Sequence, residues 1–191
     1  MAFNYLLNNN NLITNNKLIS ILESVKSSKL RGLEIGFGTG KKTISIAKEF
    51  KSFYAIEPNK IYYDKFKEIC KINKCNIKSY NMDLQNFVNY TNKKFNVIIL
   101  INVIHLLNLD DFVKISKTIL KKNNYIIIIN PHEKPINWGN NEFNKNSELF
   151  DQNKWIKFKN KLKDLYLNLL NHKYFFKFDE DLYDKYFILK I

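Results

Sequence analysis

The sequence is poor in the residues that build cross-linked folds and phosphate-gripping sites. Only two of its 191 residues are cysteines, Cys70 and Cys75, and only one of its 31 basic residues is an arginine, Arg31. The cysteines lie five positions apart, without a second pair or a neighbouring histidine, so they match neither a metal site nor a disulfide framework. We therefore expect reduced thiols in a cytoplasmic protein that holds no metal.

No stretch of the sequence is apolar for long enough to cross a membrane. The most apolar run, from Val97 to Leu107, is interrupted by Asn102 and His105, whereas a membrane helix needs about 20 apolar residues. The first eleven residues carry no basic residue and no long apolar run, which argues against a secretory signal. The sequence predicts neither membrane insertion nor a membrane partner.

The basic charge of the chain has two explanations. The formal net charge is +13 at pH 7, which favours an anionic partner such as nucleic acid. Sites that grip phosphate usually recruit arginine for its bidentate geometry, and every basic residue except Arg31 is a lysine. Lysine, asparagine and isoleucine are all abundant and share A/T-rich codons, so base composition explains the charge at least as well. Nucleic acid is therefore a disfavoured partner.

The hydrophobic pattern indicates an α/β fold. From Leu30 onward, short apolar runs alternate with longer amphipathic ones, as in strands joined by crossover helices. The predicted strands are Leu33–Ile35, Phe53–Ile56, Ile77–Tyr80, Phe95–Ile101 and Tyr125–Asn130. The predicted helices between them are Lys41–Phe50, Asn59–Asn73, Leu84–Tyr90 and Leu109–Lys121. Because the fourth and fifth strands are almost uninterrupted hydrophobe, we expect them to be buried on both faces of a parallel sheet.

One segment carries a ligand-binding pattern. Residues 33–40 read Leu-Glu-Ile-Gly-Phe-Gly-Thr-Gly and run from the first predicted strand into the first helix. Alternating glycines permit a tight turn and let a ligand lie on the backbone, and the N–H groups of the following helix favour an anion. A dinucleotide-binding G-x-G-x-x-G would need glycine at Lys41, and a G-x-x-x-x-G-K-[ST] loop does not fit Gly40-Lys41-Lys42. The pattern that remains is E-x-G-x-G-x-G.

A carboxylate follows the second predicted strand. In doubly wound folds, an acid about twenty residues beyond the glycine loop binds ribose hydroxyls, and Glu57 stands at that place, ahead of Pro58. A carboxylate before a helix can instead cap the helix. Both interpretations of Glu57 stay open.

The E-x-G-x-G-x-G segment resembles the first motif of class I S-adenosylmethionine-dependent methyltransferases, and the order of predicted elements is similar to their fold over nearly the whole chain. The resemblance implies a doubly wound, Rossmann-like sheet of seven strands, mostly parallel with an antiparallel edge strand, and helices on both faces. It also implies S-adenosyl-L-methionine as the cofactor and S-adenosyl-L-homocysteine as the product.

We expect residues 1–191 to form a single domain of this kind with four segments. Residues 1–29 are a predicted helical cap, residues 30–130 are the cofactor-binding core, and residues 131–150 are an acceptor-side insertion. Residues 151–191 supply a final helix and a strand pair that joins the sheet, Lys173–Phe178 and Lys185–Ile191.

The resemblance implies which residues bind the cofactor. Glu34 would support the glycine loop and the methionyl amino group, Asp83 and the N–H of Leu84 would face the adenine, and Asn102 would touch the methionyl end. Asp83 is also a good N-cap for the helix that begins at Leu84. The complete predicted set is Glu34, Gly36, Phe37, Gly38, Thr39, Gly40, Glu57, Pro58, Asp83, Leu84 and Asn102.

The acceptor side is predicted from the segments that follow the fourth and fifth strands. Residues 100–107 resemble a stretch of small-molecule methyltransferases, in which His105 would face the acceptor as the one catalytic candidate; a packed imidazole is the alternative. The other acceptor-side candidates are Tyr5, His132, Trp138 and Phe143. Aromatic walls suit an apolar or planar acceptor, although aromatic anchors of a surface loop would look the same. Asn102 and Asn130 do not rebuild the acidic cluster of metal-dependent members, so no metal is implied.

The sequence therefore predicts an enzyme that transfers a methyl group from S-adenosyl-L-methionine to a small molecule. Two alternatives are an RNA methyltransferase that uses the lysine-rich surface and a catalytically silent subunit that binds S-adenosylmethionine. Salt-dependent binding would indicate the first. Tight cofactor binding without turnover would indicate the second.

Overall fold

The computed structural model describes residues 16–25, 27–131, 175–180 and 184–190, together with the helical residues 153, 156, 157, 160, 161 and 164. The helices are α2 (Asn16–Ser24), α3 (Thr43–Ala47), α4 (Lys60–Ile72), α5 (Leu84–Tyr90) and α6 (Leu109–Ile119), with short 3-10 turns η1 (Ser27–Lys29) and η2 (Ile104–Leu106). The strands are β1 (Arg31–Ile35), β2 (Ser52–Ile56), β3 (Ile77–Tyr80), β4 (Phe95–Ile101), β5 (Leu120–Pro131), β6 (Phe175–Glu180) and β7 (Asp184–Lys190).

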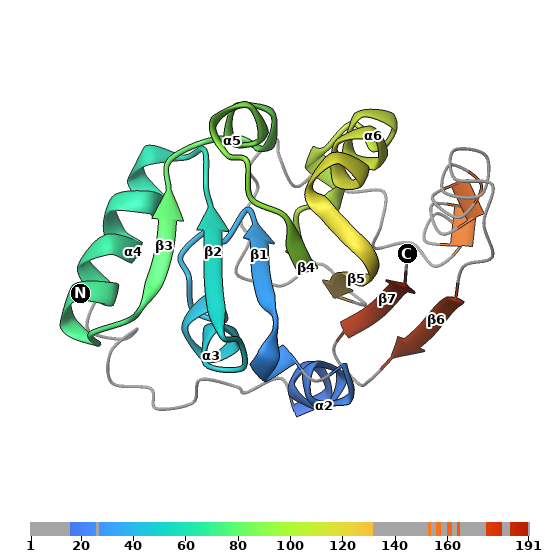
Figure 1. The fold of residues 1–191 in the computed structure, drawn as a ribbon, viewed down its shortest axis with the longest axis horizontal. Coiled ribbons are helices and arrows are strands. Elements are labelled where there is room, and N and C mark those ends of the chain that lie inside the picture. Colours follow the sequence, from blue (N-terminus) through green and yellow to red (C-terminus); the bar gives the residue numbers. More distant parts are fainter. Residues whose placement is uncertain are drawn as a thin grey trace.

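The strands form one seven-stranded sheet in the order β3-β2-β1-β4-β5-β7-β6 (Figure 1). Strands β1 to β5 pair in parallel, whereas β7 pairs antiparallel with both β5 and β6. The predicted doubly wound, mostly parallel sheet with an antiparallel strand pair at one edge is confirmed.

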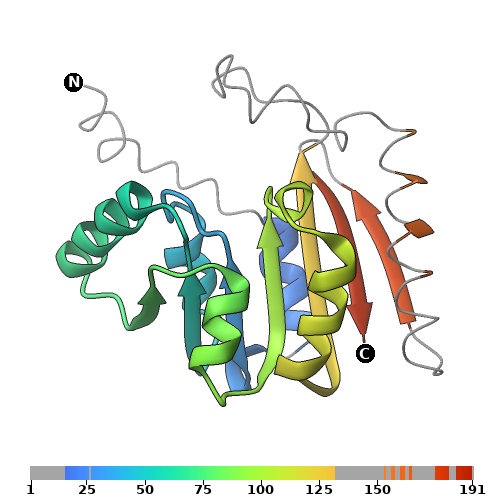
Figure 2. The same cartoon turned by 90° about the horizontal axis from the view of Figure 1, so that it is seen from above.

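Helices cover both faces of the sheet, which burial of the central strands requires. Figure 2 shows α5 and α6 on one face and α2 and α3 on the other. The first core layer combines α5 and α6 with side chains such as Leu33, Ile98 and Ile128. The second combines α2, α3 and α4 with the alternate side chains of the same strands, such as Ala55 and Ile99. Successive residues of each strand thus feed opposite layers.

The helix limits follow from capping side chains. The Asn59 side chain accepts hydrogen bonds from the N–H groups of Ile61 and Tyr62 at the start of α4, and Asp83 accepts one from Asn86 at the start of α5. Both residues are strong N-cap formers. The sequence therefore predicts α5 to the residue and α4 to within one residue at each end. Within the residues that the structure describes, no helix is long and apolar enough to cross a membrane.

Two elements, α3 and β5, differ most from their predicted limits. Helix α3 is shorter than the predicted Lys41–Phe50, because its last turn continues only through i→i−3 hydrogen bonds, ending with Phe50 N–H to Ala47 O at 3.2 Å. Strand β5 begins five residues before the predicted Tyr125. Leu120 pairs with Phe95 of β4 and Tyr125 pairs with Val97, so the polar residues 121–124 form an irregularity in β5 without register partners on β4.

The glycine loop between β1 and α3 is fitted closely to α4. The Phe66 ring lies 4.4 Å from the ring of Phe37, centroid to centroid, and both side chains are buried. A Cβ added at Gly40 would lie 2.1 Å from Phe66 Cδ2, and Gly40 has a φ of +72°. Only glycine satisfies both conditions. Gly38 has a φ of +55°, but a Cβ there would meet no atom within 4 Å.

We predict that Gly40→Ala destabilises the ligand-free protein more than Gly38→Ala. Gly40→Ala combines a left-handed backbone with overpacking and should cost about 2–4 kcal/mol, whereas Gly38→Ala should cost about 1 kcal/mol from the backbone alone. Unfolding in urea measures both values. Equal losses for the two variants would contradict the packing of Phe66 on Gly40.

Candidate functional site

The candidate site lies where the crossover connections diverge. Strands β1 and β4 are neighbours in the sheet, but the chain leaves β1 toward β2 and leaves β4 toward β5 on the other side. In open α/β sheets such a divergence leaves a crevice at the carboxyl ends of the strands. The glycine loop follows β1 at this edge, Glu57 follows β2, and Asn102 follows β4.

The glycine loop presents its backbone to this crevice. Gly36 and Gly40, with φ of +70° and +72°, are tied into the protein: the Gly36 N–H donates to Ile56 O at 2.8 Å, and the Gly40 N–H donates to Phe37 O at 2.9 Å. Gly38, between them, has open space where a side chain would lie. A ligand can therefore approach the backbone at Gly38.

The Glu57 carboxylate braces this loop. Its Oε2 accepts a hydrogen bond from the Gly38 N–H at 2.8 Å, and its Oε1 accepts one from the Asn59 N–H at 2.9 Å. The residue is only 6% exposed. Because each carboxylate oxygen has about two lone pairs, Glu57 has room for two further hydrogen bonds, as a diol would donate. The α4 N-cap is Asn59, so Glu57 does not take the capping role that was its alternative.

Glu34 is a buried carboxyl with an unused oxygen. It is 2% exposed, and its Oε2 has no hydrogen-bond partner among the described residues. Burial raises its pKa from the ordinary value of 4.5 to about 7; Thr43 and Lys42 lower the pKa by smaller amounts, and Glu57 raises it. A buried acid with an unpaired oxygen near the carboxyl end of a strand can accept a hydrogen bond from a cationic donor.

Asn102 holds a second unused oxygen at the adjacent strand end. Its backbone is left-handed, with φ of +57°, and its N–H donates to Ile129 O at 2.8 Å. The buried Oδ1 has no partner within the described part of the chain. The next residue, Val103, lies so close to Gly36 that a Cβ on that glycine would be 2.5 Å from Val103 Cγ2. The end of β4 and the glycine loop are thus packed together.

Asp83 and Leu84 lie at the start of α5. Asp83 is exposed, and both of its carboxylate oxygens accept hydrogen bonds from Asn86, one from the backbone N–H and one from Nδ2, each at 2.8 Å. The capping role of Asp83 is thus present in the structure, and its contact with adenine stays a prediction. Leu84 is buried in the core, and its N–H is among the first amides of the helix, which have no intrahelical partner.

The remaining predicted residues are the other cofactor-side residues, His105 and the acceptor-side candidates. Phe37 packs on Phe66 in the core, whereas Thr39 and Pro58 are exposed. His105 lies in η2, and the structure describes its backbone but not its side chain. The acceptor-side candidates Tyr5, His132, Trp138 and Phe143 lie outside the described residues.

Two residues of the site are missing from the sequence-based predictions. Thr43 is buried, and its hydroxyl is near enough to Glu34 to lower the carboxyl pKa, yet not in hydrogen-bonding geometry, so its Oγ1 also has no partner among the described residues. Asn81 donates from Nδ2 to the carbonyl oxygens of Glu57 and Pro58, at 2.8 and 3.0 Å. The only signal in the sequence is a polar residue in an apolar helix face or directly after a strand, which is too common to single out either residue.

The site offers hydrogen-bond acceptors and backbone amides. Within the described ranges, no group of three or more His, Cys, Asp or Glu side chains could hold a metal ion. The arrangement suits an organic ligand that carries hydroxyls toward Glu57 and a cationic donor toward Glu34 and Asn102. A bound ligand of that kind would satisfy the buried oxygens that the protein leaves unpaired.

Comparison with known proteins identifies a methyltransferase domain in the part of the chain that holds this site. Residues 33–123 match the family model described as a methyltransferase domain, which spans the glycine loop and continues into β5. No curated protein matches the chain.

Several solved structures have a similar fold. One is an rRNA methylase from Streptococcus thermophilus, with a TM-score of 0.62, 14% identity, and coverage of 90% of this chain and 92% of that one. Another is an S-adenosylmethionine-dependent methyltransferase from Aquifex aeolicus, with a TM-score of 0.64, 16% identity, and coverage of 91% of this chain and 88% of that one. A third is a methyltransferase complexed with S-adenosylhomocysteine, with a TM-score of 0.63, 12% identity, and coverage of 94% of this chain and 50% of that one.

These identities are low, so the structural likeness shows the fold, while the matched domain contains the glycine loop, Glu57 and Asn102. Residues 33–123 match the methyltransferase-domain family, and the chain shares the fold of solved S-adenosylmethionine-dependent methyltransferases.

Proposed function

We propose that this methyltransferase acts on a small-molecule acceptor. The observation that carries the proposal is the position of Arg31, the single arginine of the sequence. It begins β1, at the opposite end of the strand from the glycine loop. Its Nη1 donates to Lys94 O at 3.2 Å, and its guanidinium lies 6.0 Å from the centroid of the Tyr54 ring. The site therefore has no guanidinium to grip a phosphate backbone.

The residues present fit the cofactor. Glu57 would accept hydrogen bonds from the ribose hydroxyls with its free lone pairs, while the open face of Gly38 would lie against the ligand. Glu34 Oε2 and Asn102 Oδ1, both buried and without partners among the described residues, would accept from the methionyl ammonium. Asp83 and the Leu84 N–H would face the adenine. When bound, S-adenosylmethionine supplies an electrophilic methyl group on a sulfonium.

Methyl transfer is an in-line displacement, so the protein has to align the acceptor nucleophile with the methyl carbon and exclude water. A general base is needed only where the acceptor must lose a proton. We place His105 on the acceptor side of the site. It follows the end of β4, three residues after Asn102. The imidazole would accept a proton from the acceptor or orient it by a hydrogen bond.

An RNA acceptor is the second candidate function. Two observations favour it: the net charge of +13 and the similarity of the fold to an rRNA methylase. Lysines alone can neutralise phosphates. The two candidates differ in how strongly acceptor binding depends on salt.

We predict that Glu57→Ala weakens S-adenosylhomocysteine binding at least about tenfold, since charged hydrogen bonds contribute roughly 1.5–3 kcal/mol. Asp83→Ala should weaken binding less and instead lower stability by about 1 kcal/mol through loss of the α5 cap. Calorimetric titration and urea unfolding separate the two effects. Unchanged affinity in folded Glu57→Ala, or the reverse ranking, would move the ribose contact to another residue.

Glu34→Gln should stabilise the ligand-free protein at pH 8 and weaken cofactor binding. The folded pKa of about 7 lies above the ordinary 4.5, so between these values the unfolded chain loses its proton first. Glu34 therefore lowers stability progressively as pH rises from 4.5 to 7, by at most about 3 kcal/mol. The glutamine variant avoids this cost.

Melting temperatures of the ligand-free proteins from pH 5 to pH 8 measure the effect. The advantage of Glu34→Gln should vanish toward pH 5, where the native carboxyl is protonated as well. A variant that is less stable at pH 8 would show that Glu34 is ionised and paired. A variant with unchanged affinity for S-adenosylhomocysteine would show that Glu34 does not contact the cofactor.

The acceptor class can be tested with labelled S-adenosylmethionine and either total RNA or a metabolite extract, each at low and at physiological salt. We expect label in the metabolite fraction with little salt dependence, because a small neutral acceptor releases few counterions. His105→Ala should abolish this turnover and leave cofactor affinity intact. Label in RNA alone at physiological salt would establish the second candidate.

A further inference from the structure

The end of α4, about one helical turn beyond Phe66, forms a second chemically distinct feature. The Cys75 N–H donates to Cys70 O at 3.0 Å, and the Lys74 N–H donates to Lys71 O at 3.4 Å. Lys74 has a left-handed backbone with φ of +50°. These two bonds around a left-handed residue define a Schellman motif, whose cap is Asn73.

In a Schellman motif the residue at each end of the longer hydrogen bond contributes a side chain to a mutual contact. Here both of these residues are cysteines. Burial, followed by the nearby Cys75, raises the pKa of the Cys70 thiol to about 12. Both cysteines are half-buried and unbridged. A disulfide needs Cα atoms about 4.4–6.8 Å apart, and the direct backbone bond between the two residues holds them close.

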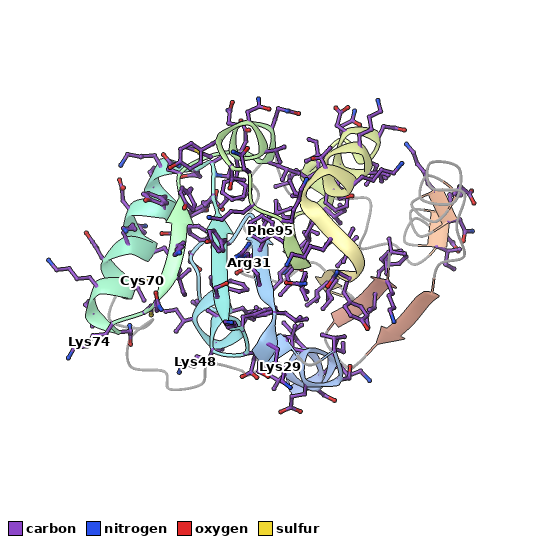
Figure 3. The ribbon with its side chains drawn as sticks, in the orientation of Figure 1. Lys29, Arg31, Lys48, Cys70, Lys74 and Phe95 are labelled. Carbon is purple, nitrogen blue, oxygen red and sulfur yellow. The ribbon has the colours of Figure 1, made fainter. Side chains whose placement is uncertain are left out.

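The thiols are also accessible. They line an open groove of about 430 Å³ together with Lys67, Lys71 and Glu68, and both lysines are exposed. Figure 3 shows Cys70 and Lys74 at this end of α4, next to the start of β3. An accessible thiol in basic surroundings is the kind that reacts with small oxidants.

We propose that Cys70 and Cys75 form a redox-active dithiol that a peroxide converts into an intramolecular disulfide. The Schellman motif already holds the two residues together through a direct backbone hydrogen bond, so closure requires no refolding of α4. The proposal does not depend on which acceptor the enzyme methylates.

The chemistry assigns different roles to the two sulfurs. Cys75 attacks a peroxide oxygen as its thiolate, the O–O bond breaks, and one water leaves after the released hydroxide takes a proton. The Cys75 sulfenic acid is then attacked by Cys70, whose proton passes to the departing oxygen. The S–S bond forms, the S–O bond breaks, and the second water leaves. Two thiols are oxidised by two electrons, and hydrogen peroxide is reduced to two waters. Cys75 reacts first because burial disfavours the Cys70 thiolate; Cys70 gives up its proton only when it attacks the adjacent sulfenic acid.

The sequence allows a direct test on the full chain. Hydrogen peroxide is added, remaining thiols are alkylated, and trypsin is used to cut after Lys67, Lys71, Lys74 and Lys78, which places the cysteines on separate peptides. We expect an intact-mass loss of about 2 Da, the two thiol hydrogens, and a linked pair of peptides, 68–71 with 75–78. A reductant should separate the pair.

Two sets of variants control the test. Cys75→Ser should slow the loss of the Cys70 thiol at least about tenfold, because Cys70 lacks thiolate character. Lys74→Gly keeps the left-handed position and should form the disulfide as readily as the native chain. Lys74→Val disfavours that backbone and should slow closure. Affinity for S-adenosylhomocysteine should be the same before and after oxidation.

Three outcomes would overturn the proposal. They are both thiols remaining fully alkylatable after peroxide, irreversible oxidation of one cysteine without a linked peptide pair, and links formed only between molecules. Equal closure rates in the native, Lys74→Gly and Lys74→Val proteins would also overturn the role given to the Schellman motif.

Discussion

The contact of Phe66 with the glycine loop is the constraint on which the functional end of this molecule depends. The loop can turn tightly after β1 only because Gly40 has no side chain, and the space that this leaves is filled by a ring from α4. Phe37, from within the loop, packs on the same ring. This packing fixes the loop from below. Its upper side, at Gly38, is left for hydrogen bonding with Glu57 and for a ligand.

Buried polar atoms mark the same end of the sheet. Among the described residues, three of the four buried side-chain atoms without hydrogen-bond partners belong to Glu34, Thr43 and Asn102. Each such atom costs about 1–3 kcal/mol of stability. Because a protein gains nothing in the folded state by leaving them unpaired, their grouping is best explained by a ligand that pairs them. The site thus lowers the stability of the empty protein to bind its cofactor.

Much of the fold follows from local patterns, and the site follows only in part. Asn59 and Asp83 each stand directly before the helix that they cap, so the limits of α4 and α5 could be predicted closely. The start of β5 could not, because Leu120 pairs with Phe95 of β4 across an irregularity, and the polar residues 121–124 between Leu120 and Tyr125 carry no strand pattern. The positions of Glu34, Gly38 and Glu57 were predictable from motif spacing. Thr43 and Asn81 were not, since their contacts join segments whose proximity no local pattern encodes.

The placement of β7 has a consequence for how the chain folds. Strands β1 to β5 follow one another along the chain and make four pairings in the sheet. Three of these join consecutive strands, and the fourth, between β1 and β4, has only β2 and β3 between its strands in the chain. The edge of β5 that faces away from β4, along Ile126 to Ile129, is paired with β7, residues 184–190. During synthesis this apolar edge emerges long before its partner, as an open strand edge that can pair with another chain. The half of the sheet that contains the glycine loop can therefore form early, whereas protection from aggregation depends on β7, which is synthesised later and lies far away in the sequence.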